Sequence, residues 1–180
     1  MPKMPKLKSI KVSLSLPSIG GIEGTWEPDE SERKAAWDLY VELVTCVAVE
    51  ELRPEEGLLR EALSSLYTLF DTTREILREY GPTIAQPKGE AGLSFGYLAV
   101  TILNTVLRPV LAKWHPLLLD YESTRAGAVS PLEHERRWDK YGELRGELNQ
   151  VRGVLTEYVD LLAEVAGVPS LVVKRKKRKA

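Results

Sequence analysis

Apolar and polar residues alternate strictly near the start of the chain. The apolar positions run from Ile10 to Leu16 with one Lys and two Ser between them, a period of two that is typical of a half-buried strand. A turn rich in proline and glycine follows, and the alternation resumes from Ile22 to Trp26. We therefore predict a β-hairpin over residues 8–26. Because an isolated hairpin is marginal in water, this one must pack on the remaining chain or pair with another one.

From residue 29 onward the apolar residues recur every three or four positions, which predicts four long helices. Capping signals mark several of their ends. Asp29 with Glu32 marks the start of the first helix, Gly81 the end of the second, and Ser130 and Gly167 the start and the end of the last helix. The predicted helices span residues 29–52, 55–80, 93–121 and 130–167. The first is expected to bury a stripe formed by Trp37, Tyr40, Val41, Val44, Val47 and Ala48.

Two of the predicted helices have special features. The third is apolar nearly all round, which marks a central element, and Pro109 and Pro116 are expected to kink or divide it. The last has a heptad-like seam from Tyr141 to Val165. A helix of roughly 36 residues spans about 54 Å at about 1.5 Å per residue, so we expect it to outrun its partners and to offer an oligomerisation seam.

Together these patterns predict a mainly all-α protein, an antiparallel bundle of four long helices whose third helix is kinked at prolines, with a small N-terminal β-hairpin. The apolar segment Leu171 to Val173 predicts a short third strand. The domain organisation is then a hairpin appendage over residues 1–28, a four-helix bundle over 29–169, and a short strand with a basic tail over 170–180.

The formal charge of −1 hides an uneven distribution. The chain has 25 Lys and Arg against 26 Asp and Glu, and ten of the basic residues lie within the first eleven positions or in one run near the end. Without these ends, 15 basic and 26 acidic residues remain, a formal −11. The run consists of Lys174, Arg175, Lys176, Lys177, Arg178 and Lys179. It is a candidate for sequence-independent binding to nucleic acid, with an acidic protein face or an anionic membrane as alternatives.

Composition argues against several classes of protein. A single Cys rules out an internal disulfide framework and the usual thiolate zinc site. A di-metal carboxylate bundle needs Glu-x-x-His pairs, whereas Ala112 and Pro131 stand three residues before the only two His. We therefore expect no metal and no cofactor. No apolar stretch reaches about 18 residues, so we do not expect a membrane span.

The best candidate for chemistry lies on the predicted third helix. On a continuous helix, Arg108 and His115 project within about 40° of Asn104, and Lys113 and Trp114 lie close by. This polar stripe could bind an anion. It could also supply an imidazole that pairs with a carboxylate of the first helix, such as Glu42 or Glu50.

The alternative that we favour for this stripe is a structural network. In it Arg108 pairs with an acid of a neighbouring helix, Asn104 satisfies the carbonyl that Pro109 frees, and His115 bonds to backbone at the Pro116 break. Two further residues are expected to be unreactive. His134 stands between two Glu and is expected in solvent, and Cys46 is expected in the core.

Several short segments carry a resemblance. The runs Leu107-Arg108-Pro109 and Leu111-Ala112-Lys113-Trp114-His115-Pro116, together with Thr25-Trp26-Glu27-Pro28 and Ala166-Gly167-Val168-Pro169, resemble a signature of uncharacterised bacterial helical proteins. The resemblance implies a bacterial cytoplasmic protein that is an accessory of a conflict or defence gene cluster. The group has no assigned activity, so the resemblance says nothing about catalysis.

Our first hypothesis is a non-enzymatic interaction or scaffold protein, an accessory subunit that forms an oligomer or binds a protein partner. The first alternative is a nucleic-acid-binding accessory that acts through the basic tail. The second is a ligand-binding or enzymatic bundle that uses the polar stripe. A membrane role ranks last, because Arg108, Lys113 and His115 interrupt the most apolar helix.

Overall fold

The structure is a computed structural model that describes residues 9–17, 19–49, 53 and 56–172. It is mainly helical, with one small N-terminal hairpin. In chain order the elements are β1 (Ile10–Leu14), β2 (Ile22–Trp26), α1 (Glu30–Thr45), a 3₁₀ turn (Val47–Val49), α2 (Leu59–Tyr80), a second 3₁₀ turn (Gly81–Ala85), α3 (Phe95–Ile102), a π-helical turn (Leu103–Leu107), α4 (Arg108–Ser123), α5 (Pro131–Arg136) and α6 (Tyr141–Ala166).

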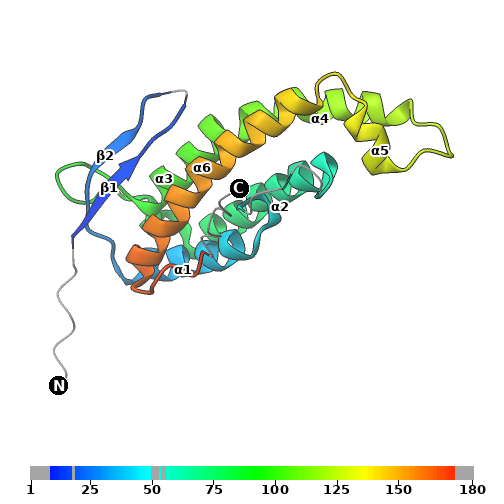
Figure 1. The fold of residues 1–180 in the computed structure, drawn as a ribbon. Coiled ribbons are helices and arrows are strands. Elements are labelled where there is room, and N and C mark those ends of the chain that lie inside the picture. The colour runs from blue at the N-terminus through cyan, green and yellow to red at the C-terminus, as the bar shows by residue number, and fades with distance from the viewer. Residues whose placement is uncertain (1–8, 18, 50–52, 54–55, 173–180) are drawn as a thin grey trace.

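The molecule is elongated, with the hairpin at one end and α5 at the other (Figure 1). Helix α6 runs along most of this length and packs on α1, on α4 and on β1. Helix α2 packs on α1 and on α4. Helices α1, α2, α4 and α6 therefore surround one hydrophobic core, and the polar faces of α2 and α4 meet at its surface.

The predicted hairpin is confirmed. Strands β1 and β2 are antiparallel, with Ile10 opposite Trp26 and Leu14 opposite Ile22. The apolar side chains of β1 are buried and the polar ones are exposed, as the alternation predicts. The predicted third strand is not seen: Leu171 and Val172 have no strand conformation, and Val173 lies outside the described residues.

A buried carboxylate joins the hairpin to the helices. Glu32 has no exposed surface and accepts hydrogen bonds from Trp26 Nε1, from the backbone N–H groups of Asp29 and Phe95, and from Lys88 Nζ. Asp29 caps α1 in return by accepting from the Glu32 N–H at 2.9 Å. The capping box therefore also holds the hairpin and the start of α3 in place.

Helix α1 is shorter than predicted, and part of its expected stripe was assigned wrongly. The helix ends at Thr45, and its buried face contains Ala36, Leu39 and Leu43, whereas Trp37 and Val41 are 42% and 40% exposed. The small alanines let α1 approach its neighbours on that face. The largest apolar residues therefore indicated a face that is shifted by about one residue from the face that is buried.

Helix α2 begins later than predicted and ends where predicted. Its first residue is Leu59, because Gly57 has a φ of +75°, a left-handed conformation that interrupts a helix. Its last residue is Tyr80, followed by Gly81 with a φ of +68°. The glycine stop signal was therefore a good guide to the end of this helix.

The third predicted helix, which we expected to be kinked or divided at its prolines, is not divided. It runs through α3, a π-helical turn over Leu103–Leu107, and α4. Pro109 follows this turn. Its ring crowds the carbonyl four residues back and it has no N–H to donate to it, and the wider π turn accommodates both effects. Pro116 lies inside α4 at an exposed position, where solvent can bind the freed carbonyl.

The fourth predicted helix is divided. Helix α5 has the expected Ser130 cap, whose hydroxyl accepts from the Glu133 N–H, but it ends at Arg136, and α6 begins only at Tyr141. The break turns Trp138 inward, where it stacks on Tyr121. The heptad seam of α6 is buried inside this fold from Leu144 to Val165, so it does not project as an oligomerisation seam.

The continuous helix Phe95–Ser123 is long and apolar enough to cross a membrane by length and composition, contrary to our expectation from the sequence. The share of its most apolar window that is buried inside the fold is 56%. Core helices of soluble proteins have the same composition, so this feature is weak evidence for a membrane span.

Candidate functional site

The candidate site is an open groove of about 320 Å³ between α2 and α4. Helix α2 contributes Tyr67 and Phe70, and α4 contributes Arg108. Tyr67 is 44% exposed, an unusual degree for a large aromatic side chain, whereas Phe70 is nearly buried at the base. The groove therefore combines an apolar aromatic floor with a charged rim. The full lining is Tyr67, Phe70, Asp71, Arg74, Arg108, Leu111 and Ala112.

Two guanidinium groups lie near the same aromatic ring. The Cζ atom of Arg74 is 4.8 Å from the centroid of Phe70, and that of Arg108 is 5.3 Å from it. Both distances are in the range of a cation–π interaction. Phe70 therefore holds two cationic groups at the groove although their charges repel one another.

The two arginines differ in their remaining partners. Arg74 pairs with Asp71 at 3.3 Å, and both side chains are at least half exposed, so this pair is weak. Arg108 donates its Nε–H to Asn104 Oδ1 at 3.0 Å and has no carboxylate partner within the described part of the chain. The terminal amino groups of Arg108 therefore remain able to bind an anion.

His115 lies about two helical turns beyond Arg108 on the same face of α4. Its Nδ1 atom is 3.0 Å from Nη1 of Arg60. A guanidinium only donates hydrogen bonds, so Nδ1 accepts and the imidazole is the neutral tautomer with its proton on Nε2. The ring also meets Tyr67 edge to face at 5.2 Å. His115 thus joins the end of the groove to α2.

Arg60 is itself fixed by a carboxylate. It binds Glu122 with both its Nε and Nη2 atoms, at 2.9 and 2.7 Å, and both side chains are less than one-third exposed. Such a two-point contact is the strong form of this interaction. Arg60 and Glu122 therefore neutralise one another, and the uncompensated charge of the groove is that of Arg108.

The structure divides the predicted polar stripe between two faces of α4. Arg108 and His115 share a face that meets α2, and Asn104 in the π turn accepts a hydrogen bond from Arg108. Lys113 and Trp114 face α6, where Lys113 pairs with Glu143 and Glu147 and the buried Trp114 donates to Glu147 at 2.6 Å. These two residues hold α4 on α6 and take no part in the groove.

The predicted partners of the stripe were largely wrong. Arg108 lies over Phe70 and bonds to Asn104 in place of a neighbouring acid. His115 bonds to Arg60 in place of backbone or Glu42, and Glu50 lies outside the described residues. One alternative paired His115 with a carboxylate of the first helix, whereas the structure packs α4 on α2 at this point.

Four residues of α2 line the groove and were not predicted as site residues: Tyr67, Phe70, Asp71 and Arg74. Tyr67 and Phe70 belong to an apolar helix pattern, and Arg74 stands on an ordinary charged face. One signal was available: Arg74 follows Phe70 by four residues, the spacing at which two side chains of a helix touch. Only the packing of α4 on this turn shows that Arg108 joins them.

A second polar cluster surrounds Glu135, which is almost fully buried at 2% exposure. Its carboxylate accepts from the backbone N–H groups of Leu59 and Arg60 at 2.9 and 3.2 Å, so it caps α2, whose own cap residue supplies no side-chain bond. Burial raises the pKa of Glu135, the two backbone bonds oppose this rise, and nearby Glu122 adds to it. This residue supports the fold at the end of the groove.

The remaining candidates are structural. His134 is not simply solvated as predicted: its ring stacks on Tyr121 at 4.2 Å, and its Nε2 atom lies 2.9 Å from the Tyr121 carbonyl oxygen. Cys46 is partly buried, with its Sγ atom 2.8 Å from the Ser65 hydroxyl. Within the described ranges, no three His, Cys, Asp or Glu side chains are arranged to hold a metal ion. The polyanion candidates Lys174 to Lys179 lie outside those ranges.

The groove is suited to binding an anionic group next to an apolar or aromatic one. A carboxylate can accept from the amino groups of Arg108, and an attached apolar group can lie against Tyr67 and Leu111.

Comparison of the chain with known protein families, with curated proteins and with solved structures finds no match. The resemblance to bacterial accessory proteins therefore stays a prediction.

Proposed function

We propose that this protein is a non-enzymatic interaction module that binds an acidic segment of a partner protein in the groove between α2 and α4. The four long helical segments, α1, α2, α3 with α4, and α6, act in this proposal as an antiparallel bundle that keeps the groove in shape. In the biological setting that the resemblance implies, the protein is a cytoplasmic accessory subunit of a bacterial conflict or defence system.

One observation carries the proposal. Arg108 is exposed, lies over the ring of Phe70, and lacks a carboxylate partner in the described part of the chain. The rest of the body is strongly acidic, so an uncompensated guanidinium in an aromatic groove is a local exception. A Glu or Asp side chain beside a Phe, Tyr or Leu on the partner complements both halves of this groove.

Exposed tyrosine and arginine next to a nearly buried phenylalanine also have the composition of an interaction hot spot. Tyr and Arg are enriched at such positions, because each combines apolar surface with a polar end. The groove is too open to enclose a small substrate, since Arg74 and Asp71 at its rim are 51% and 69% exposed. A segment of another protein can cover this rim.

The test uses a pair of fluorescent peptides, one with Glu on both sides of a Phe and the other with Gln in place of each Glu. Fluorescence anisotropy with the full-length protein should show binding of the Glu peptide only. Arg108→Gln should weaken that binding by about tenfold or more, since hydrogen bonds to charged groups contribute about 1.5–3 kcal/mol.

Arg78→Gln is the matched control. Arg78 lies one turn beyond Arg74 on α2, is exposed and does not line the groove. This variant removes the same charge and should leave the affinity unchanged. Equal loss in both variants, or no loss in Arg108→Gln, would show that the peptide binds through general charge, for example at the basic ends of the chain, and would contradict the proposal.

A further inference from the structure

The seam where α2 and α4 meet is longer than the groove described above. Arg60 at the start of α2 binds Glu122 at the end of α4, whereas Phe70 lies further along α2, under Arg108 at the start of α4. The two helices are therefore antiparallel. The seam runs from the Arg60–Glu122 pair to Arg74, which is about four helical turns on α2, or about 21 Å at about 1.5 Å per residue.

An apolar strip follows this seam and is exposed to solvent. Ala112, Pro116 and Leu119 are exposed and are separated by four and three residues, so they lie on one face of α4. Leu119 is 55% exposed. Tyr67 of α2, whose ring meets that of His115, continues the strip across the seam and is 44% exposed. The apolar strip thus consists of Tyr67, Ala112, Pro116 and Leu119.

The free charge of the seam is at one end. Arg60 and Glu122 neutralise one another at the far end, whereas Arg74 and Arg108 both lie near the ring of Phe70, and in the described part of the chain only Arg74 has a carboxylate partner. Arg108 precedes Leu119 by about three helical turns. An occupant that meets both residues therefore has its acidic group near one end and apolar groups over the following turns.

Both walls of the seam are helices, and this restricts the conformation of an occupant. Apart from the carbonyl that Pro116 frees, the backbone groups along these walls bond to one another within each helix. They cannot pair with the backbone of a partner as the edge of a sheet can. An extended segment on the apolar strip would bury N–H and C=O groups without partners. A helical segment pairs these groups internally and presents side chains alone.

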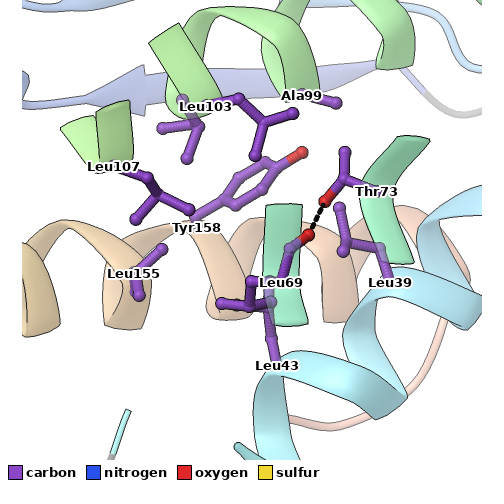
Figure 2. Close-up of a pocket in the computed structure, with 10 residues that line it drawn as sticks. Leu39, Leu43, Leu69, Thr73, Ala99, Leu103, Leu107, Leu155 and Tyr158 are labelled. Atoms are coloured by element: carbon purple, nitrogen blue, oxygen red, sulfur yellow. Dashed lines mark hydrogen bonds between the residues drawn. The ribbon is translucent and has the colours of Figure 1, made fainter. Parts of the chain in front are cut away.

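The seam is held in shape from inside the fold. Figure 2 shows Leu69 and Thr73 of α2, and Leu103 and Leu107 of the π turn, around the ring of Tyr158. The turn of α2 and the π turn that are packed in this way lie directly behind the end of the seam that carries the two arginines. A site that is already ordered binds a partner at a lower cost in conformational entropy.

We propose that the seam between α2 and α4 binds an amphipathic α-helix of a partner protein, with an acidic residue of that helix at Arg108 and its apolar residues on the apolar strip. This inference rests on the proposed function and specifies the conformation of the partner segment. A helix of about four turns spans the seam. Its apolar positions recur every three or four residues, as in other helices that bind in grooves.

The test compares two fluorescent peptides of about 18 residues by anisotropy with the full-length protein. The first has Glu near one end and Leu at every third or fourth position over the next turns, on an Ala-rich background that favours a helix. The second has Pro in place of one Ala in the middle of its solvent-facing side. We expect the second peptide to bind at least about tenfold more weakly, because proline inside a helix strongly disfavours it.

Two exposed leucines of α4 provide a matched pair of protein variants. Leu119→Asn removes an apolar residue of the strip and should weaken binding of the helical peptide about tenfold. Leu117→Asn is the control, because Leu117 is 37% exposed on the same helix but projects about 160° away from Leu119. It should leave the affinity unchanged. Equal affinities in the wild type and Leu119→Asn, or equal losses in the two variants, would overturn the proposal.

The outcomes also separate this inference from the function on which it rests. If both peptides bind equally and Arg108→Gln weakens both, the groove binds acidic segments that are not helical, and this inference alone fails. If Arg108→Gln leaves the affinity for the helical peptide unchanged, the acidic group is not recognised at Arg108, and both the inference and the proposed function fail.

Discussion

At the scale of single residues, two buried carboxylates determine how separate segments are joined. Glu32 accepts from donors on the hairpin, the start of α1, the loop before α3, and α3 itself. Glu135 accepts from the first two N–H groups of α2. Each carboxylate satisfies groups that would otherwise be buried without a partner, so its removal affects more than one element.

We predict that Glu32→Ala destabilises the protein by about 3–5 kcal/mol, the loss typical of removing one partner of a buried ion pair. The free energy of unfolding in urea measures this effect. Glu30→Ala is the control, because Glu30 lies on the same helical turn with a side chain that is 73% exposed and should cost about 0.5 kcal/mol or less. Similar losses in both variants would show that the buried network contributes little.

A second prediction concerns Tyr80. Its hydroxyl donates to Asp38 at 2.5 Å, and this bond, together with partial burial, raises the pKa of Tyr80 to about 12. Because the folded pKa is raised, the bond stabilises the protein fully below the ordinary phenol pKa of about 10, and this stabilisation is lost as the pH rises through 12. A ¹³C NMR titration of the tyrosine ring carbons should show this value, and Asp38→Asn should lower it toward the ordinary one. An unchanged titration in Asp38→Asn would contradict the assignment.

At this scale, features that depend on neighbouring residues could be predicted from the sequence. Contacts between distant residues could not. The caps at Asp29, Ser130 and Gly167 were all predicted, because each depends on residues within four positions. The role of Glu135 was not, since its partners lie about 75 positions away along the chain. Nothing in the local pattern distinguishes Glu135 from the exposed Glu133 beside it.

At the scale of the elements, the existence of each long helical segment was predictable and its contact face was not. The period of the apolar residues locates α1, α2 and α6, but it cannot say that two alanines of α1 pack inward while Trp37 remains half exposed. The prolines were recognised as points of strain. Whether a helix then breaks or widens depends on the neighbours that hold it, and here it widens into a π turn.

The cap on α2 allows a test at this scale. We predict that Glu135→Ala costs about 2 kcal/mol in the free energy of unfolding, since it leaves the buried N–H of Leu59 and the part-buried N–H of Arg60 without an acceptor. Amide hydrogen exchange should become faster at Leu59 and Arg60. Glu133→Ala, on the same short helix but half exposed, should change neither quantity by much. Unchanged exchange at Leu59 in Glu135→Ala would show that α5 does not cap α2.

At the scale of the whole molecule, two ionised carboxylates contribute to the stability of the folded protein. Partial burial raises the pKa of Glu147, but hydrogen bonds from Lys113 and Trp114 outweigh it and hold the pKa below its ordinary value. Asp29 has a lowered pKa as well, since bonds from Lys88 and from the start of α1 outweigh its burial. Both carboxylates therefore stabilise the folded state while ionised.

This sign predicts acid sensitivity. The contribution of a carboxylate with a lowered pKa is complete above the ordinary value of about 4 and is lost as the pH falls through the lowered folded value. The stability difference between the wild type and Glu147→Gln, measured by urea unfolding, should be constant from about pH 7 to pH 5 and shrink below about pH 4. A difference that stays constant into this acidic range would contradict the role of Glu147. The comparison with a single variant isolates this effect from Glu135, whose raised pKa acts with the opposite sign.

The groove is a property of the whole molecule, because it exists only where α2 and α4 meet. The sequence indicated that Arg108 and His115 share a face, and this was correct. It could not indicate that Phe70 and Arg74 complete the site, or that Lys113 and Trp114 leave it for α6. A projection of one helix shows which of its residues share a face. It cannot show which residues of a second helix pack on that face, and the charges of the groove come from both helices.

The most direct test of the central claim is to locate an anion on the protein. Two-dimensional NMR spectra that resolve the arginine Nε–H signals should be recorded during a titration with phenylacetate, and again with the uncharged phenylacetamide. We predict that phenylacetate shifts the signals of Arg108 and Arg74 and the amides near Phe70, and that phenylacetamide does not. Shifts confined to the basic ends of the chain, or no difference between the two compounds at Arg108, would contradict the account.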